Sequence, residues 1–357
     1  LVRPPAIVEL VEQFIRTAAV LGLLLFFLPQ YPERVVGLIV LGMVICEVFS
    51  ACTLSVLYRR RLGRLGLNGP GETARIRRKR VLSIALPVGA NALLGNLMGA
   101  ANATLIPQKL VEGGMERSAA ISEFGVVCGM TMPMLSLPIV FLGALNLVLV
   151  PRLARACALN WPGEVRRLSS RAMAAVSVLT LPAMALMVVL GPDLGRLMFK
   201  QDGVGEHLIP LAVTTAMSCY CSVLAAVLNG VGRQKEVAAV SLLGGGVQLA
   251  CTLVPVLGMK GYVAGALVST ALELVLCLSL VLRHTGLRPQ LFRWMTAPGL
   301  ASLLAALNTN LLLRYLKASG LPLLWAGLGS LAFALVLYLA ALHAQGVSLR
   351  DTLRVKW

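Results

Sequence analysis

The sequence predicts an all-α integral membrane protein of about ten transmembrane helices. Hydrophobic residues make up 58% of the 357 residues and charged residues only 13%, about half the charged fraction that is usual in soluble domains. Long apolar runs recur along the whole chain, and none shows the period-two alternation of a membrane β-barrel. Because a backbone in lipid must satisfy its own hydrogen bonds, these runs are predicted to be helices.

Each run is long enough to cross a hydrocarbon layer of about 30 Å, which takes about 20 helical residues. The ten predicted runs are 6–28, 35–57, 81–106, 121–150, 172–191, 208–229, 237–258, 260–282, 294–316 and 321–343. Lysine and arginine number 23 on the side that carries both termini and 8 on the other side. By the positive-inside rule, both termini are predicted to be cytoplasmic.

The net charge of +17 is explained by this topology rather than by nucleic acid binding, because the charges lie between apolar runs. Anionic membrane lipids are an additional expected partner. The longest basic segment, 58–80, separates two predicted helices from the eight that follow and is interpreted as a linker between two bundles.

Charged residues enter the first run, where polar groups are costly in lipid and usually face a bundle interior or a wet cavity. Glu9, Glu12 and Arg16 lie at positions i, i+3 and i+7, on one helical face. Two readings stay open: a Glu12–Arg16 pair that neutralises itself, or a charged cavity wall.

The third run carries a polar stripe that includes Asn91 and Asn102, and Pro87 interrupts its hydrogen-bond ladder near the start. The asparagines either bridge helices or line a cavity that binds sugar or phosphate. The fourth run contains Pro133 and Pro138, which predict a bend or hinge.

Three further polar residues lie within apolar runs. Asn146 lies near the end of the fourth run and is a candidate cavity residue. Glu47 and Glu273 are lone carboxylates at membrane depth, which either pair with a neighbour or couple transport to H⁺, Na⁺ or the membrane potential.

The residues predict no enzyme. There is no nucleophile elbow, zinc-protease helix motif or phosphate-binding loop, so no catalytic residue is proposed. No CxxC pair occurs among the eight cysteines and histidines number three, so neither a metal site nor a bound cofactor is predicted.

Several segments resemble the stage V sporulation protein B group, which belongs to the multidrug/oligosaccharidyl-lipid/polysaccharide flippase superfamily. The order and spacing of these segments carry the resemblance over nearly the whole chain. They are EQ-x-x-R from Glu12 to Arg16, IALPVGANALLGNLMGAANATLIPQKL from Ile84, GMTMP at Gly129–Pro133, LVPRLA at Leu149–Ala154, LNGVGRQ at Leu228–Gln234 and VP…GMKGY from Val254 to Tyr262.

The resemblance implies a V-shaped architecture of two six-helix lobes followed by two helices, here without the first four helices. Residues 1–57 would be the last two helices of the N-terminal lobe and 58–80 the inter-lobe linker. Residues 81–282 would be the C-terminal lobe, and 283–357 the additional helix pair with a short cytoplasmic tail.

The function implied by the resemblance is translocation of an undecaprenyl-linked sugar or peptidoglycan precursor by alternating access in the bacterial cytoplasmic membrane. It would serve cell-wall, polysaccharide or spore-cortex synthesis, with wall-synthesis proteins as further expected partners. In this mechanism Arg16 would contact the pyrophosphate, and Asn91 and Asn102 the sugar.

Two other functions stay open. A cation-coupled drug exporter of the same superfamily would favour acidic and aromatic cavity residues, whereas aromatic residues make up only 5% of the chain. A membrane scaffold for wall synthesis would not transport at all, and cavity substitutions would then leave it unaffected.

Overall fold

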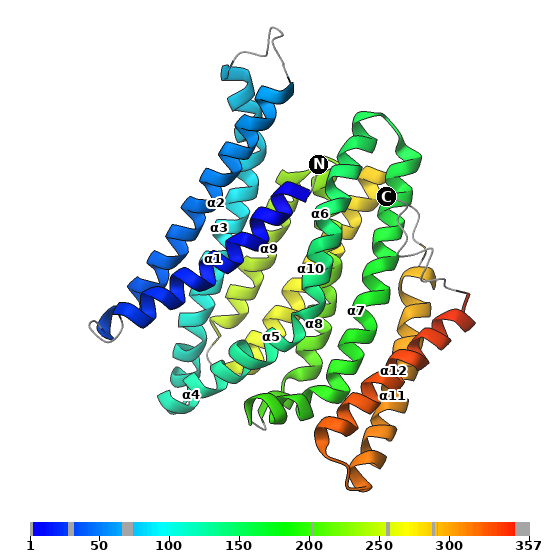
Figure 1. Cartoon of the computed structure of the whole chain (residues 1–357). Coiled ribbons are helices and arrows are strands. Elements are labelled where there is room, and N and C mark those ends of the chain that lie inside the picture. Colours follow the sequence, from blue (N-terminus) through cyan, green and yellow to red (C-terminus); the bar gives the residue numbers. More distant parts are fainter. Residues whose placement is uncertain are drawn as a thin grey trace. The chain divides into compact units, whose positions relative to one another are not determined.

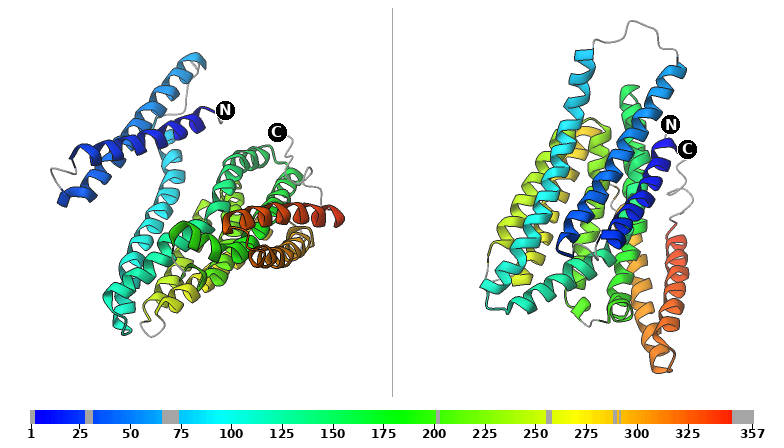
Figure 2. Two further views of the ribbon diagram at one scale, coloured as in Figure 1. Left: turned by 60° about the horizontal axis from the view of Figure 1, so that its bottom comes forward. Right: turned by 60° about the vertical axis from the view of Figure 1, so that its left-hand side comes forward.

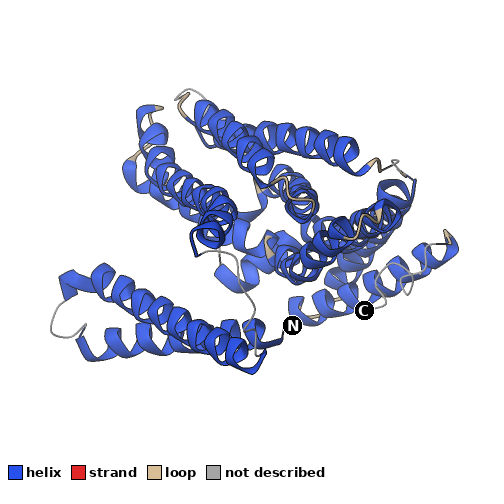
Figure 3. Cartoon of the chain, turned by 90° about the horizontal axis from the view of Figure 1, so that it is seen from above, coloured by secondary structure: helices blue, strands red, loops and turns tan. Residues whose placement is uncertain are grey.

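The computed structural model describes residues 3–27, 32–65, 74–200, 203–254, 258–287, 290 and 292–346. Among these residues every regular element is a helix and no strand occurs (Figure 3). Eight helices in the described part of the chain are long and apolar enough to cross a membrane. The predicted all-α, multi-pass membrane class is therefore confirmed.

Two helices form the first compact unit, residues 1–79. They are α1 (Arg3–Phe27) and α2 (Val35–Leu65), joined through the short η1 (Pro32–Arg34). The helices approach closely at Gly42, where a Cβ atom would lie 2.7 Å from Val20 Cγ2. A residue larger than glycine would therefore push α2 away from α1.

The second unit, residues 80–357, contains the remaining helices (Figure 1). Its elements are α3 (Ala74–Glu112), which begins in the first unit, α4 (Arg117–Phe124), η2 (Gly125–Thr131), α5 (Met132–Leu135), α6 (Leu137–Ala158), α7 (Pro162–Phe199), η3 (Gly203–Gly205), α8 (Leu208–Gly230), α9 (Gln234–Thr252), α10 (Gly258–Thr285), η5 (Phe292–Thr296), α11 (Ala297–Ala318) and α12 (Leu323–Ala344). Helix α8 packs against α6, α7, α9 and α10, and the α11–α12 pair packs against α7 (Figure 2).

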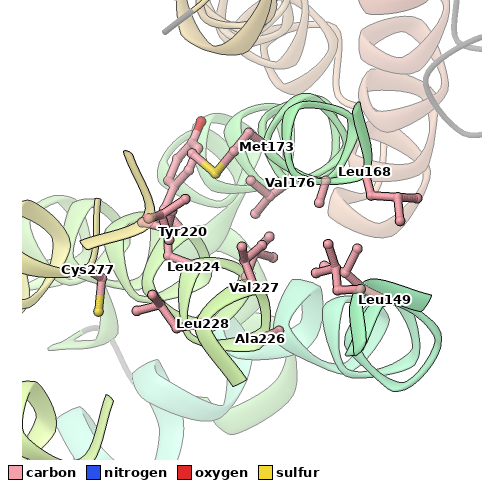
Figure 4. Close-up of a cluster of buried hydrophobic side chains, with 14 of the residues drawn as sticks. Leu149, Leu168, Met173, Val176, Tyr220, Leu224, Ala226, Val227, Leu228 and Cys277 are labelled. Carbon is pink, nitrogen blue, oxygen red and sulfur yellow. The ribbon is translucent and has the colours of Figure 1, made fainter. Parts of the chain in front are cut away.

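The core of the second unit lies around α8 (Figure 4). Leu224 and Val227 of α8 are fully buried with Val176 of α7, and Leu149 of α6 is 6% exposed. In lipid, such contacts stabilise a bundle through van der Waals packing, because the surrounding chains are as apolar as leucine. This packing fixes where the polar side chains of α6 and α8 meet.

The helices extend well past the predicted apolar runs. Helix α2 continues to Leu65 and α3 begins at Ala74, so most of the predicted linker 58–80 is helical, and 66–73 lies outside the described residues. The reason is that an apolar run ends where the membrane ends, whereas a helix continues into water.

The fourth predicted run, 121–150, is not one bent helix. One helical segment runs from Arg117 to Leu135, and a separate helix, α6, begins at Leu137. The interruption at Ser136 lies between Pro133 and Pro138, both of which lack the N–H that would continue the ladder. The segment before it is already widened into the π-helix η2. Whether this break moves during transport stays a prediction.

Candidate functional site

In the first unit, Arg16 lies between two carboxylates. Its Nη2 is 2.7 Å from Glu12 Oε1 on the same helix and 3.1 Å from Glu47 Oε1 on α2. The Glu12 side chain is 15% exposed and that of Glu47 is 67% exposed. The cluster therefore holds one positive and two negative groups, and Glu47 is its accessible member.

The sequence spacing indicated the Glu12–Arg16 pair but not the contact with Glu47. The residue next to Glu47 helps to explain the register, because the buried Cys46 Sγ donates to the Glu12 carbonyl at 3.2 Å. Arg16 Nε is buried and donates no hydrogen bond within the described residues. The two carboxylates thus leave one buried donor of the guanidinium unpaired.

In the second unit, Asn146 of α6 points at α8. Its Nδ2 donates to Ser222 Oγ at 2.9 Å and so bridges the two helices, a contact that the sequence did not predict for this residue. Its Oδ1 is also buried, yet accepts no hydrogen bond from the described groups. The bridge therefore uses half of the amide, and the other half is buried and unpaired, as a site for a bound water molecule would be.

The two asparagines of α3 are described to different extents. Asn102 Oδ1 is buried and has no hydrogen-bond partner among the described residues. One turn earlier, Met98 packs so closely on α9 that a Cβ on Gly245 would lie 2.2 Å from its Sδ. Asn91 and Pro87 lie in α3, but their side chains are outside the described set.

Glu273 of α10 packs against the glycine-rich part of α9. A Cβ on Gly244 would lie 2.2 Å from Glu273 Oε1 and 2.5 Å from its Cγ, so the carboxylate occupies the space that a side chain there would need. Gly244 is thus a requirement for Glu273 to enter the α9–α10 interface. The structure places Glu273 at the α9–α10 contact and Asn146 at the α6–α8 contact, while Asn102 lies on a third helix, α3.

A long apolar groove lies along α7 and α12, with contributions from the start of α6 and from Leu313 of α11. Its volume is about 720 Å³, and Asp193 is the charged residue in its lining. Several lining side chains are exposed, among them Phe141 at 64% and Leu328 at 52%. The groove is therefore open along its length rather than enclosed.

Polar contacts hold the walls of this groove together. The Tyr338 hydroxyl of α12 donates to the Val178 carbonyl of α7 at 2.9 Å, and Lys317 of α11 pairs with Asp193 of α7. Sequence reasoning missed the groove, because its residues are ordinary leucines spread over four helices. The four-residue spacing of Leu324, Leu328 and others on α12 gives only the usual pattern of a packed helix.

No family model matches this chain. A curated protein, stage V sporulation protein B of Bacillus subtilis (strain 168), is 23% identical over 275 residues, which are 72% of this chain and 51% of that protein. The chain thus spans about half the length of the curated relative it matches.

Among solved structures, the chain is similar to the lipid II flippase MurJ in an inward closed conformation. The TM-score is 0.58 at 14% identity, and the match covers 98% of this chain and 68% of that one. The resemblance to stage V sporulation protein B is confirmed, and the chain shares its fold with the lipid II flippase MurJ.

Proposed function

We propose that this protein is a flippase that moves a lipid-linked sugar across the bacterial cytoplasmic membrane by alternating access. The substrate would be an undecaprenyl-linked sugar or a peptidoglycan precursor for cell-wall, polysaccharide or spore-cortex synthesis. Both termini would lie in the cytoplasm, and the protein would act as a transporter without catalysing a reaction. The shared fold and the similarity to stage V sporulation protein B support this proposal.

The observation that carries the proposal is the open apolar groove of the second unit. Its lining is aliphatic apart from a few side chains such as Phe141, Tyr338 and Asp193. Such a surface suits a flexible hydrocarbon chain, whereas binding sites for drug-sized ligands usually add several placed polar groups. A prenyl chain could slide along this groove while its head group crosses the membrane elsewhere.

The head group would use the charged cluster of the first unit. Arg16 presents a planar set of donors that matches phosphate geometry, but Glu12 and Glu47 already neutralise it. Glu47 is the more exposed and the more distant of the two, so a pyrophosphate would displace Glu47 and leave the Glu12 pair in place.

This exchange offers a route to proton coupling. A proton on Glu47 would remove one of the two negative charges beside Arg16, so proton uptake and anion binding would favour each other. The break at Ser136, between two prolines, would supply one joint for the change of access.

The groove is tested by filling it. Gly327 lines the groove, and a Cβ there meets nothing within 4 Å, so position 327 accepts a side chain and Gly327→Phe is designed to fill the groove with its ring. The natural full-length protein is reconstituted in vesicles with a labelled undecaprenyl-pyrophosphate sugar. Exposure of the sugar to an impermeant reagent is then measured. We expect Gly327→Phe to slow translocation at least tenfold and Gly327→Ala to leave it near the wild-type rate.

The charged cluster is tested in the same assay. Arg16→Ala should abolish translocation, whereas Glu47→Gln should retain it and bind the substrate more tightly. If the wild-type protein moves no lipid-linked sugar, the flippase proposal fails. If it does and Arg16→Ala is as fast, only the role of Arg16 is excluded.

A further inference from the structure

Helix α7, the second arm of the hairpin that it forms with α6 (22 residues), is longer than a membrane crossing requires. Helix α7 has 38 residues, or about 57 Å at the rise of an α-helix, whereas its apolar part, 172–191, accounts for about 30 Å. Residues 162–171 therefore extend about 15 Å beyond the hydrocarbon layer, and 152–158 of α6 accompany them over about 10 Å.

This projecting end is firmly packed. Leu153 and Ala156 of α6 are buried with Val165 and Leu168 of α7, as part of the main hydrophobic core. The end of α8 supports it as well, since a Cβ on Gly230 would lie 2.6 Å from Leu153 Cβ. The hairpin end is therefore held by the same side-chain core as the rest of the second unit.

The turn at its apex fixes the backbone of Trp161. Asn160 takes a left-handed conformation with φ +52°, and the Trp161 N–H donates to the Ala156 carbonyl at 2.9 Å, which closes α6 in the manner of a Schellman motif. The Trp161 carbonyl in turn accepts from the N–H groups of Glu164 and Val165 at the start of α7. Presenting this side chain to a partner therefore costs little backbone entropy.

Two apolar side chains stand at this apex. Trp161 is 55% exposed and Leu159 is 45% exposed. Head groups add only about 5 to 7 Å on each side of the hydrocarbon, so an apex about 10 to 15 Å out reaches beyond them. The positive-inside rule explains arginines here, but it does not by itself explain an exposed tryptophan on a fixed backbone.

The charge around this apex indicates the chemistry of a partner. Residues 152–171 contain five arginines and one glutamate, a net charge of +4, and Glu164 pairs with Arg167 at 2.7 Å. Arg155 and Arg166 are exposed beside the apolar pair. Tryptophan and arginine are also the residues that most often dominate protein–protein interfaces.

We propose that this basic apex, Arg152–Arg171, docks an acidic protein surface that has an apolar socket for Trp161. The partner lies on the arginine-rich side of the membrane. Charge complementarity brings it to the hairpin and the buried tryptophan holds it there.

The test places a photo-crosslinking amino acid at position 161 of the full chain in its native cells. The control carries the same amino acid at Trp325, which is 65% exposed at the start of α12. We expect a discrete protein adduct from position 161 alone, mapped to an acidic segment. R155Q/R166Q should reduce the adduct at least tenfold. Replacing the acidic residues of the partner's crosslinked segment with lysine should reduce the adduct in the same way when Arg155 and Arg166 are intact.

Four outcomes would overturn the proposal. They are no adduct at 161, an adduct with phospholipid, an adduct with a second copy of this chain, and an adduct that is insensitive to R155Q/R166Q. Translocation by R155Q/R166Q in purified vesicles should match wild type, because no partner is present there. A loss of transport would point instead to damage to the bundle.

Discussion

Replacing Asn146 with leucine would separate a structural role from a ligand-binding role. The Asn146 Nδ2 bond to Ser222 is an interhelical hydrogen bond, which in membrane proteins contributes about 0.6 kcal/mol on average. The buried Oδ1 without a described partner costs about 1–3 kcal/mol. Because leucine has the same γ-branched shape and removes both polar groups, Asn146→Leu should stabilise the protein by about 1 kcal/mol, or about 1–2 °C in unfolding midpoint for a chain of 357 residues.

Substitution of Ser222, the acceptor of the same hydrogen bond, should change the stability in the opposite direction. Ser222→Ala deletes the acceptor of Nδ2 and leaves both ends of the Asn146 amide without a described partner, which should cost about 1–3 kcal/mol. Thermal unfolding in detergent, followed by tryptophan fluorescence, measures both variants. If Asn146 binds a polar substrate, Asn146→Leu should raise the midpoint and at the same time lower translocation.

Two results would refute this reasoning. A lower unfolding midpoint for Asn146→Leu would mean that Oδ1 already has a hydrogen-bond partner outside the protein, such as a bound water molecule. A higher midpoint with unchanged translocation would keep the structural account and remove Asn146 from the candidate cavity residues.

Two further predictions concern close helix contacts. Gly244→Ala should destabilise the protein, because its Cβ would lie 2.2 Å from Glu273 Oε1 and overpacking costs about 1–3 kcal/mol, more than the gain of about 1 kcal/mol in helix propensity. Gly246→Ala, where nothing lies within 4 Å of the added Cβ, should be neutral or stabilising. Equal unfolding midpoints for Gly244→Ala and Gly246→Ala would contradict the close contact between Gly244 and Glu273. Tyr338→Phe should lower the unfolding midpoint by the equivalent of about 1 kcal/mol, since it removes the bond to Val178 at 2.9 Å; an unchanged midpoint would mean that α12 is held by packing alone.

The helices were predictable because lipid leaves the backbone few choices, so apolar length alone located most of them. Their true ends were not, because the parts of α2, α3 and α7 beyond the membrane are polar and lack that signal. The prolines at 133 and 138 predicted an irregularity, but one that ends a helix at Ser136 differs from one that bends it. In the structure the break at Ser136 follows the π-helical segment η2, which no local pattern in the sequence predicted.

The candidate site divides in the same way. The Glu12–Arg16 pair could be predicted from sequence, because residues four apart share a helical face. The contact between Arg16 and Glu47 could not, because it depends on how α1 and α2 pack at Gly42. Likewise, the groove of α7 and α12 exists only once four helices are assembled.

The sequence by itself determined that this is a multi-pass helical membrane protein, which residues carry charge into the membrane and which flippases it resembles. Those properties follow from composition and local spacing. Only the tertiary structure decided that Arg16 is shared by two carboxylates, that Asn146 uses half of its amide, and that Trp161 stands on a rigid basic apex. Each of these depends on contacts between helices, whose registers are set by the fit of small residues and cannot be calculated from a single helix.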